Sequence, residues 1–178
     1  MQGAVLAVLA LVGTLALAFV DRIREADAPA ATVSVEADAG LLVGIARVTD
    51  GDSLRLGEER IRLHGIDAPE ARQECRRADG AAWACGEVAG SRLAALADGR
   101  EVACRTIERD RFGRVVARCA VDGVDLGATL VEEGLAFAYR SFSLDYVAHE
   151  ERARAARRGI FDGDNMAPWD WRRAQRQR

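Results

Sequence analysis

The sequence contains no lysine, only two histidines and only three prolines among 178 residues. Arginine therefore supplies all the basic charge apart from histidine, which we attribute mainly to genomic composition. The scarcity of histidine and the absence of a Cys-x-x-Cys spacing exclude the usual zinc-ligand patterns. The net charge of −3 argues against a protein that coats nucleic acid through charge alone. It does not exclude an enzyme whose cleft is locally charged.

What remains is an ordinary globular composition, with 49% hydrophobic and 30% charged residues. Once the two ends are set aside, roughly 130 residues remain, which is enough for one domain with a hydrophobic core. The chain shows no internal repeat.

The first part of the chain differs from the rest, because residues 3–20 form a continuous apolar run. Its eighteen residues exceed a usual signal-peptide core of about 7 to 15 and reach the lower end of a membrane-spanning helix, roughly 17 to 25. Residues 16–18, Ala-Leu-Ala, match a cleavage pattern. A cleaved signal peptide and an uncleaved membrane anchor over residues 1–20 both remain open. Arg22 and Arg24 after the run favour a cytoplasmic C-terminal side.

The four cysteines indicate the opposite side of the membrane. Cys104 and Cys119 lie in successive strand-like runs whose turn falls near residues 110–113, so they should face each other across a hairpin. Cys75 and Cys85 bracket one short loop. Two local pairs are typical of two disulfides in an exported domain, whereas the alternative is four reduced thiols in a cytoplasmic protein. We expect the disulfides, and a periplasmic, extracellular or inner-membrane-anchored protein with this domain outside the cytoplasm.

Alternation and turn residues predict five strands and three helices. The expected strands cover residues 41–48, 53–56, 60–66, 101–107 and 114–121. The expected helices cover 86–97, 126–133 and 144–158, and Asp125 and Ser143 should cap the second and the third. In the third strand Ile61 and Leu63 should share one face, and Arg62 and His64 the other. These elements predict an α+β fold built on a small five-stranded Greek-key barrel of the OB type, preceded by an N-terminal hydrophobic helix.

The same reading divides the chain into a linker, one domain and a tail. Residues 21–40 are rich in alanine and acids and read as the linker, and residues 41–172 form the barrel domain. The basic tail, residues 173–178 together with Arg172, is expected to lack fixed structure and to add weak affinity for nucleic acid.

The most informative feature is a cluster of acids around one arginine. Asp50, Asp52, Asp67, Glu70 and Arg62 fall within twenty-one residues, on two adjacent strands and the following loop. Carboxylates this close repel one another unless a cation lies among them or some stay protonated. Because the arginine fork suits a phosphate, the cluster predicts metal-assisted chemistry on a phosphate ester.

Four motifs containing these residues resemble the staphylococcal nuclease (thermonuclease) family over roughly residues 41–172. They are Asp50-Gly51-Asp52-Ser53, the run from Ile61 to Glu70, the turn from Asp110 to Arg114, and the run from Leu130 to Ala136. Their order and spacing match the family. The resemblance implies an OB barrel with three helices, a single Ca²⁺ ion, and phosphodiester hydrolysis of DNA and RNA. We also expect the protein to be a monomer.

The resemblance also implies roles for individual residues. Asp52, Asp67 and the backbone carbonyl of Ala68 correspond to calcium ligands, and Asp50 should act on the metal through water. Glu70 corresponds to the proposed general base that activates water.

The remaining roles concern the substrate. Arg62 and Arg114 correspond to the two phosphate-binding arginines. Tyr139 corresponds to a base-stacking tyrosine. Asp110 either contacts substrate or only favours its turn, and Arg72 either follows a backbone phosphate or lies on a solvated loop.

The sequence thus predicts a Ca²⁺-dependent, sugar-non-specific nuclease that acts on DNA and RNA. One alternative is a non-catalytic nucleic-acid-binding OB module, against which the intact acids and arginines argue. The other is an envelope assembly protein. The membrane would be a further partner if the N-terminal helix is not cleaved.

Overall fold

The computed structural model describes residues 40–177 of the chain. The signal peptide or anchor expected over residues 1–20, and nearly all of the expected linker, lie outside the described residues. Among residues 40–177 there is no helix both long and apolar enough to cross a membrane.

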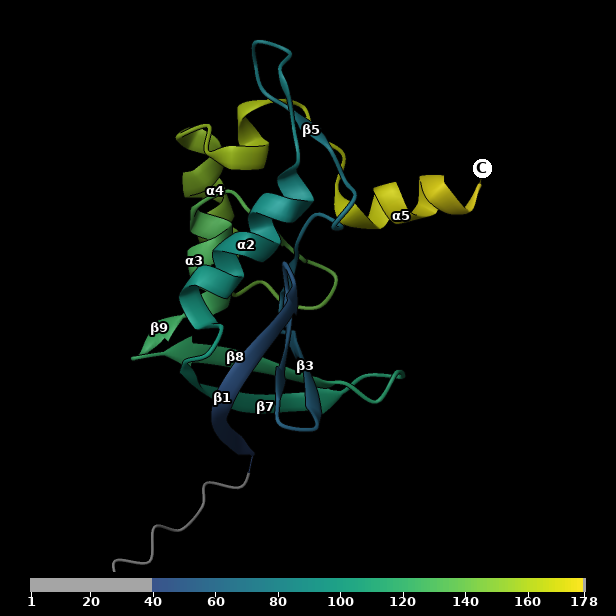
Figure 1. Cartoon of the computed structure of the whole chain (residues 1–178). Coiled ribbons are helices and arrows are strands. Elements are labelled where there is room, and N and C mark those ends of the chain that lie inside the picture. The colour runs from purple at the N-terminus through teal and green to yellow at the C-terminus, as the bar shows by residue number, and fades with distance from the viewer. Residues whose placement is uncertain (1–39, 178) are drawn as a thin grey trace, which may run out of the picture. The chain divides into compact units, whose positions relative to one another are not determined.

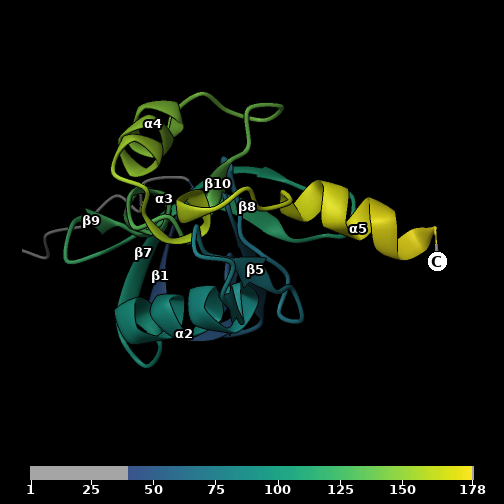
Figure 2. The ribbon, with the colours of Figure 1, turned by 90° about the horizontal axis from the view of Figure 1, so that it is seen from above.

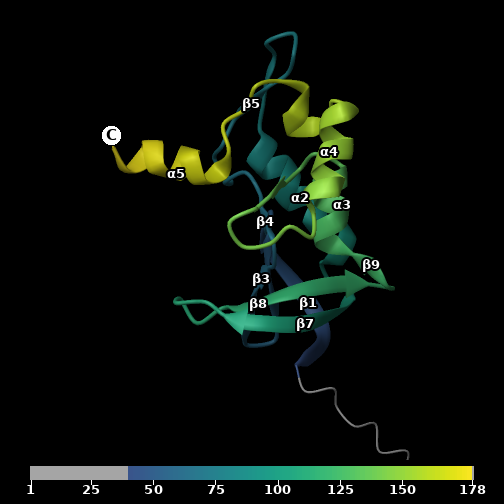
Figure 3. The same ribbon diagram turned by 180° about the vertical axis from the view of Figure 1, so that it is seen from behind.

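Five strands close into a barrel, as Figures 1 and 3 show. Strands are hydrogen-bonded in the order β3-β2-β1-β7-β8, and a parallel pairing between β3 and β8 closes the ring. The short β9 pairs antiparallel with the end of β8. These strands are β1 (Leu41–Asp50), β2 (Ser53–Leu56), β3 (Glu59–Leu63), β7 (Glu101–Arg109), β8 (Val115–Val121) and β9 (Val124–Asp125). The expected five-stranded barrel of an α+β fold is confirmed.

Strand alternation sets the core. Ile61 and Leu63 of β3 are buried, whereas Arg62 and His64 remain partly exposed on the other face, as predicted. The buried face meets apolar side chains from the other strands and the helices, all at most 2% exposed: Leu54, Leu93, Val102, Val115, Leu126 and Leu130. At roughly 25 cal/mol per Å² of apolar surface removed from water, this shared core is the main stabilising contribution to the fold.

Helices gather at one end of the barrel, where α2 packs on β1 and α3 packs on β8, on α2 and on α4 (Figure 1). They are α2 (Cys85–Ala97), α3 (Leu126–Glu132), α4 (Val147–Ala155), the 3₁₀ helix η2 (Gly159–Asp162) and α5 (Pro168–Arg176). Asp125 caps α3 by accepting from the Ala128 N–H at 2.8 Å, as predicted.

Two expectations for the helices were wrong. The helix expected over 144–158 is shorter, because Ser143 does not cap it. Its hydroxyl instead accepts from the Asp145 N–H at 3.1 Å within a local turn. The tail is not unstructured, since α5 runs to Arg176 as a fourth helix. Pro168 stands in its first turn, where a missing N–H costs nothing.

Two short two-stranded pairings shape the loops above the barrel. The strand expected over 60–66 breaks at Gly65, whose φ is +71°. The chain then continues as β4 (Ile66–Asp67), which pairs antiparallel with β10 (Phe137–Ala138). Farther on, β5 (Cys75–Arg76) pairs with β6 (Ala82–Trp83). The break matters for function, because it turns Asp67 inward.

Both expected disulfides are present. Cys104 and Cys119 are direct partners across the β7–β8 hairpin and are buried. Cys75 and Cys85 join β5 to the first residue of α2. No cysteine among residues 40–177 is free. One bridge therefore fixes the barrel wall, and the other fixes the loop that follows Glu70.

We expect the bridge across the hairpin to stabilise the domain. Replacing Cys104 and Cys119 together by alanine should lower the free energy of unfolding by roughly 2 to 4 kcal/mol, since the unfolded chain is no longer constrained. Urea denaturation of the double variant and the wild type measures this difference. A reductant should lower the wild-type urea midpoint, because both bridges are lost. The midpoint of the double variant should fall less, because only the Cys75–Cys85 bridge remains to be reduced. Midpoints that do not respond to reductant in either protein would show that neither bridge forms.

Candidate active site

The first carboxylate, Asp52, is the second residue of the tight turn between β1 and β2. Its backbone N–H donates to Asp50 Oδ1 at 3.1 Å, which fixes the turn. A Cβ atom at Gly51 would lie 2.8 Å from the Cβ of Ala68, so only glycine lets the turn approach the β4 segment this closely. As a result Asp52 is only 4% exposed, and its Oδ2 accepts from the Ala68 N–H at 3.0 Å.

The second carboxylate, Asp67, ends β4 and is fully buried. Its register partner on β10 is Phe137. Both carboxylates converge on Arg62 of β3, which forms an ion pair with Asp52 and donates to Asp67 Oδ1 at 2.7 Å. Arg62 also donates to the Ile66 carbonyl at 3.3 Å. Strand geometry thus brings together three residues that the sequence grouped.

The electrostatics of Asp52 reflect this crowding. Burial raises the pKa of its carboxyl, and the charges of Asp50 and Asp67 raise it further, while Arg62 and the Ala68 N–H oppose them. The outcome is a pKa of about 6, against an ordinary value of 3.8. Burial is therefore the main reason that this carboxyl holds its proton more tightly than usual.

Glu70 follows on a loop that two neighbours hold in place. The buried Gln73 side chain accepts from the Glu70 N–H at 3.2 Å, and the Gln73 N–H donates to the Glu70 carbonyl at 2.7 Å. At the start of α2, a Cβ on Gly86 would lie 1.7 Å from the Glu70 carbonyl oxygen, so the helix touches this loop directly. Gln73 was missed in the sequence, since nothing local distinguishes it from a surface glutamine.

A further residue that the sequence did not predict for the site is Arg172 of α5. Its guanidinium donates to Glu70 Oε1 at 2.6 Å, and to Asp67 Oδ2 at 2.7 Å and Oδ1 at 3.2 Å. Figure 2 shows α5 starting near the centre of the domain and extending outward to the C-terminus. The only sequence signal was the helix start at Pro168, followed by Trp169 and Trp171.

Arg114 lies in a separate group beside this cluster. It follows the β7–β8 turn, and its Nε donates to Asp110 Oδ2 at 2.8 Å. Although burial opposes the shift, these hydrogen bonds from Arg114 hold the pKa of Asp110 below its usual range. Arg114 and Asp50 line one small pocket of about 140 Å³, together with Arg60. Asp110 thus orients Arg114, and Asp50 links the two groups.

The two remaining predicted residues lie apart from the carboxylates. Tyr139 stacks on Trp169 with ring centroids 5.0 Å apart and planes 5° apart, and also contacts Phe142. Arg72 is exposed on the loop after Glu70.

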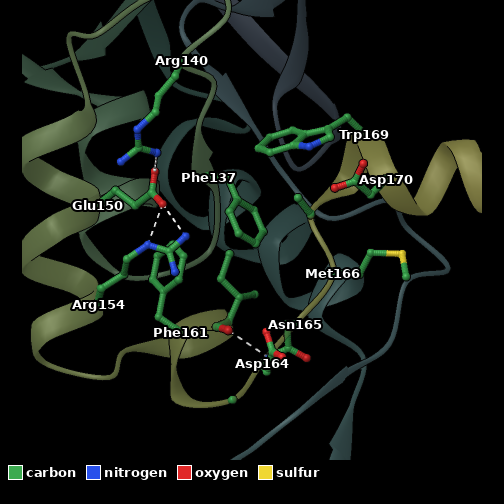
Figure 4. A pocket seen from close by; sticks show the side chains of 13 residues that line it. Phe137, Arg140, Glu150, Arg154, Phe161, Asp164, Asn165, Met166, Trp169 and Asp170 are labelled. Carbon is green, nitrogen blue, oxygen red and sulfur yellow. Dashed lines mark hydrogen bonds and ion pairs between the residues drawn. The ribbon is translucent and has the colours of Figure 1, made fainter.

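A second pocket, of about 340 Å³, is lined by Phe137 and Trp169 among others (Figure 4). On its wall the buried Glu150 accepts from Arg140 at 2.6 Å, from Arg154 Nε at 2.7 Å and from the Ala138 N–H at 3.1 Å. These contacts tie α4 to β10, the strand that pairs with the Asp67 segment. The contacts of Glu150 therefore help to hold β10, and through it the segment that carries Asp67.

As they stand in residues 40–177, no three His, Cys, Asp or Glu side chains form a group that could hold a metal ion. Both oxygens of Asp67 already accept from guanidinium groups. The cluster combines four carboxylates, two guanidiniums and the loop of Glu70 at one end of the barrel.

Comparison with known proteins identifies the family of this chain. Residues 60–162 match the family described as staphylococcal nuclease homologue. The chain is 35% identical over 162 residues to a micrococcal nuclease of Shigella flexneri, covering 81% of this chain and 87% of the relative. An uncharacterized endonuclease of Escherichia coli is 32% identical over 136 residues, 72% and 82% of the two chains.

A third relative carries a different kind of name. The succinoglycan biosynthesis protein ExoI of Rhizobium meliloti is 40% identical over 102 residues, 54% of this chain and 53% of its own length, so the chain spans about half of that relative. The family match covers most of the barrel and reaches η2, and the relative of Shigella flexneri covers most of the chain. On these matches and on its barrel, this protein belongs to the staphylococcal nuclease family.

Proposed function

We propose that this protein is a calcium-dependent nuclease that hydrolyses phosphodiester bonds in both DNA and RNA. The observation that carries the proposal is the convergence of two buried aspartates on Arg62, next to Glu70, in a family whose relatives include named nucleases. A barrel that only bound nucleic acid would have no need for buried carboxylates, which are costly to keep charged.

The donor set at this position fits a hard divalent cation. Asp52, Asp67 and the Ala68 carbonyl would hold it, since calcium prefers oxygen ligands, and Asp50 would act through water. Asp52, Asp67 and Glu70 share two guanidiniums, those of Arg62 and Arg172, so the carboxylates outnumber their ion-pair partners. The pKa of Asp52 is raised by burial and by the neighbouring charges of Asp50 and Asp67, so its carboxylate would gain from a bound cation. When bound, such a cation supplies positive charge to the phosphate oxygens.

The chain's own groups account for the rest of the chemistry. Glu70 is the base that takes a proton from the attacking water, at the mouth of the cluster. Arg62 and Arg114 bind the phosphate oxygens through their planar forks, and Asp110 keeps Arg114 oriented. Tyr139 offers a ring face to a base. Arg72 lies on the exposed loop where a flanking phosphate would pass.

We place this activity outside the cytoplasm. Two disulfides in so small a domain favour an oxidising compartment, such as the periplasm or the extracellular space. Nucleic acid reaching that compartment is the substrate, and the protein acts as a monomer. If residues 1–20 are not cleaved, they anchor it to the inner membrane.

Cleavage of plasmid DNA and of a single-stranded RNA by the purified protein tests the proposal. We expect both to be degraded with calcium and neither with a chelator. Glu70→Gln should lower turnover by roughly 10²- to 10⁴-fold, the usual contribution of a general base. Glu74→Gln, an exposed acid on the same loop, is the matched control and should keep full turnover. Binding of nucleic acid without cleavage by the wild type would favour the binding-module alternative.

Asp52 gives a second test, through the stability of the metal-free protein. Its pKa is raised on folding from 3.8 to about 6, so the folded state holds this proton more tightly than the unfolded state. The contribution to stability is therefore present below pH 4 and is lost as the pH rises through about 6. Asp52→Asn removes the titrating group and should flatten this fall. Urea denaturation with chelator across pH 4 to 7 measures this fall in stability. Parallel pH profiles for the variant and the wild type would refute a raised pKa at Asp52.

A further inference from the structure

Arg172 occupies a central position in the carboxylate cluster, although it comes from the last helix of the described chain. It contacts both oxygens of Asp67 and one oxygen of Glu70, at 2.6 to 3.2 Å. Asp67 is fully buried, and Glu70 and Arg172 are each about one-third exposed. The contact therefore spans the site from its buried floor to its open side.

This contact and a cation at Asp67 exclude each other. Asp67 Oδ2, which would bind a cation, accepts an N–H group from Arg172. A divalent cation placed there would also lie next to a fixed positive charge, which repels it strongly in a partly buried site. Arg62 also contacts Asp67, but its side chain is less exposed than that of Arg172, at 17% against 33%, and it pairs with the buried Asp52 as well. Arg172 is therefore the group that must leave.

The attachment of α5 allows such a movement. The helix is held at its start, where Trp169 stacks on Tyr139 and where the preceding Met166 carbonyl accepts from Gln73 at 2.7 Å. From Arg172 onward its residues are partly or fully exposed, and Figure 3 shows the helix extending away from the barrel. The Arg172 side chain can leave the cluster while the helix start stays in place.

We propose that Arg172 is a positioning residue of the metal site: it balances Asp67 and Glu70 in the cation-free protein and competes with calcium for that place. Binding of calcium at Asp52 and Asp67 displaces it. The displacement also removes the guanidinium from Glu70, so the base becomes available only when the cation is bound. The C-terminal helix thereby sets the calcium affinity of the site. This inference rests on the proposed function, because it needs the cation at these carboxylates.

Calorimetric titration of the purified protein with calcium, without substrate, tests the competition. Arg172→Gln keeps a long polar side chain but removes the charge, and should bind calcium about tenfold more tightly or better, because no ion pair has to be broken. Arg172→Lys retains the charge and should stay close to the wild type. Arg173→Gln is the matched control on the same helix, since Arg173 is exposed and pairs with Asp170. Its affinity should not change.

Hydrogen exchange gives a readout that does not depend on affinity. In the wild type, calcium should speed amide exchange over the second half of α5, whereas in Arg172→Gln exchange should already be fast and respond little to calcium. A merely structural arginine would leave the calcium response unchanged between the two proteins.

The outcomes distinguish failure of this inference from failure of the proposed calcium-dependent function. If wild type and Arg172→Gln bind calcium equally well, or the variant binds more weakly, the competition is refuted while the metal site stands. If neither protein binds calcium, the metal assignment fails and the competition fails with it. Tighter binding by Arg172→Gln alone supports both.

Discussion

Repulsion between buried carboxylates is the constraint on which the rest of this structure depends. Asp52 and Asp67 are both nearly inaccessible to water, and an isolated charge in such a position is strongly unfavourable. Arg62 meets both, and the barrel register puts it there from the neighbouring strand. Two glycines make this arrangement possible. Gly51 allows the close approach that buries Asp52, and the break at Gly65 turns Asp67 inward. The site is a consequence of how the barrel closes.

The second half of the site comes from the far end of the sequence. Gln73 and Arg172 connect the loop of Glu70 to the segment around Met166 and to α5, across sequence separations of 93 and 102 residues. The Cys75–Cys85 bridge holds the same loop against α2. The family match ends at residue 162, so α5 lies beyond it. An element outside the matched region thus contacts the residues that we assign to catalysis.

The sequence predicted those features that depend on residues close together in the chain. Strand alternation, the cap at Asp125 and the turn before Arg114 are local, and the two cysteine pairs are each at most 15 residues apart, so the sequence predicted them correctly. The ion pair of Arg172 joins residues more than a hundred positions apart, and a basic tail gives no sign of its partner. The start of α4 was misjudged because Ser143 satisfies a turn as well as a helix. The roles proposed for Asp52, Asp67, Glu70 and the arginines stay predictions.

The central claim is that these buried carboxylates form a cation site that Arg172 fills when the cation is absent. A crystal structure of the calcium-loaded protein tests it most directly. The account predicts one calcium ion coordinated by Asp52, Asp67 and the Ala68 carbonyl, with the Arg172 guanidinium moved away from Asp67 and Glu70. Calcium bound elsewhere, with Arg172 still bridging Asp67 and Glu70, would contradict it.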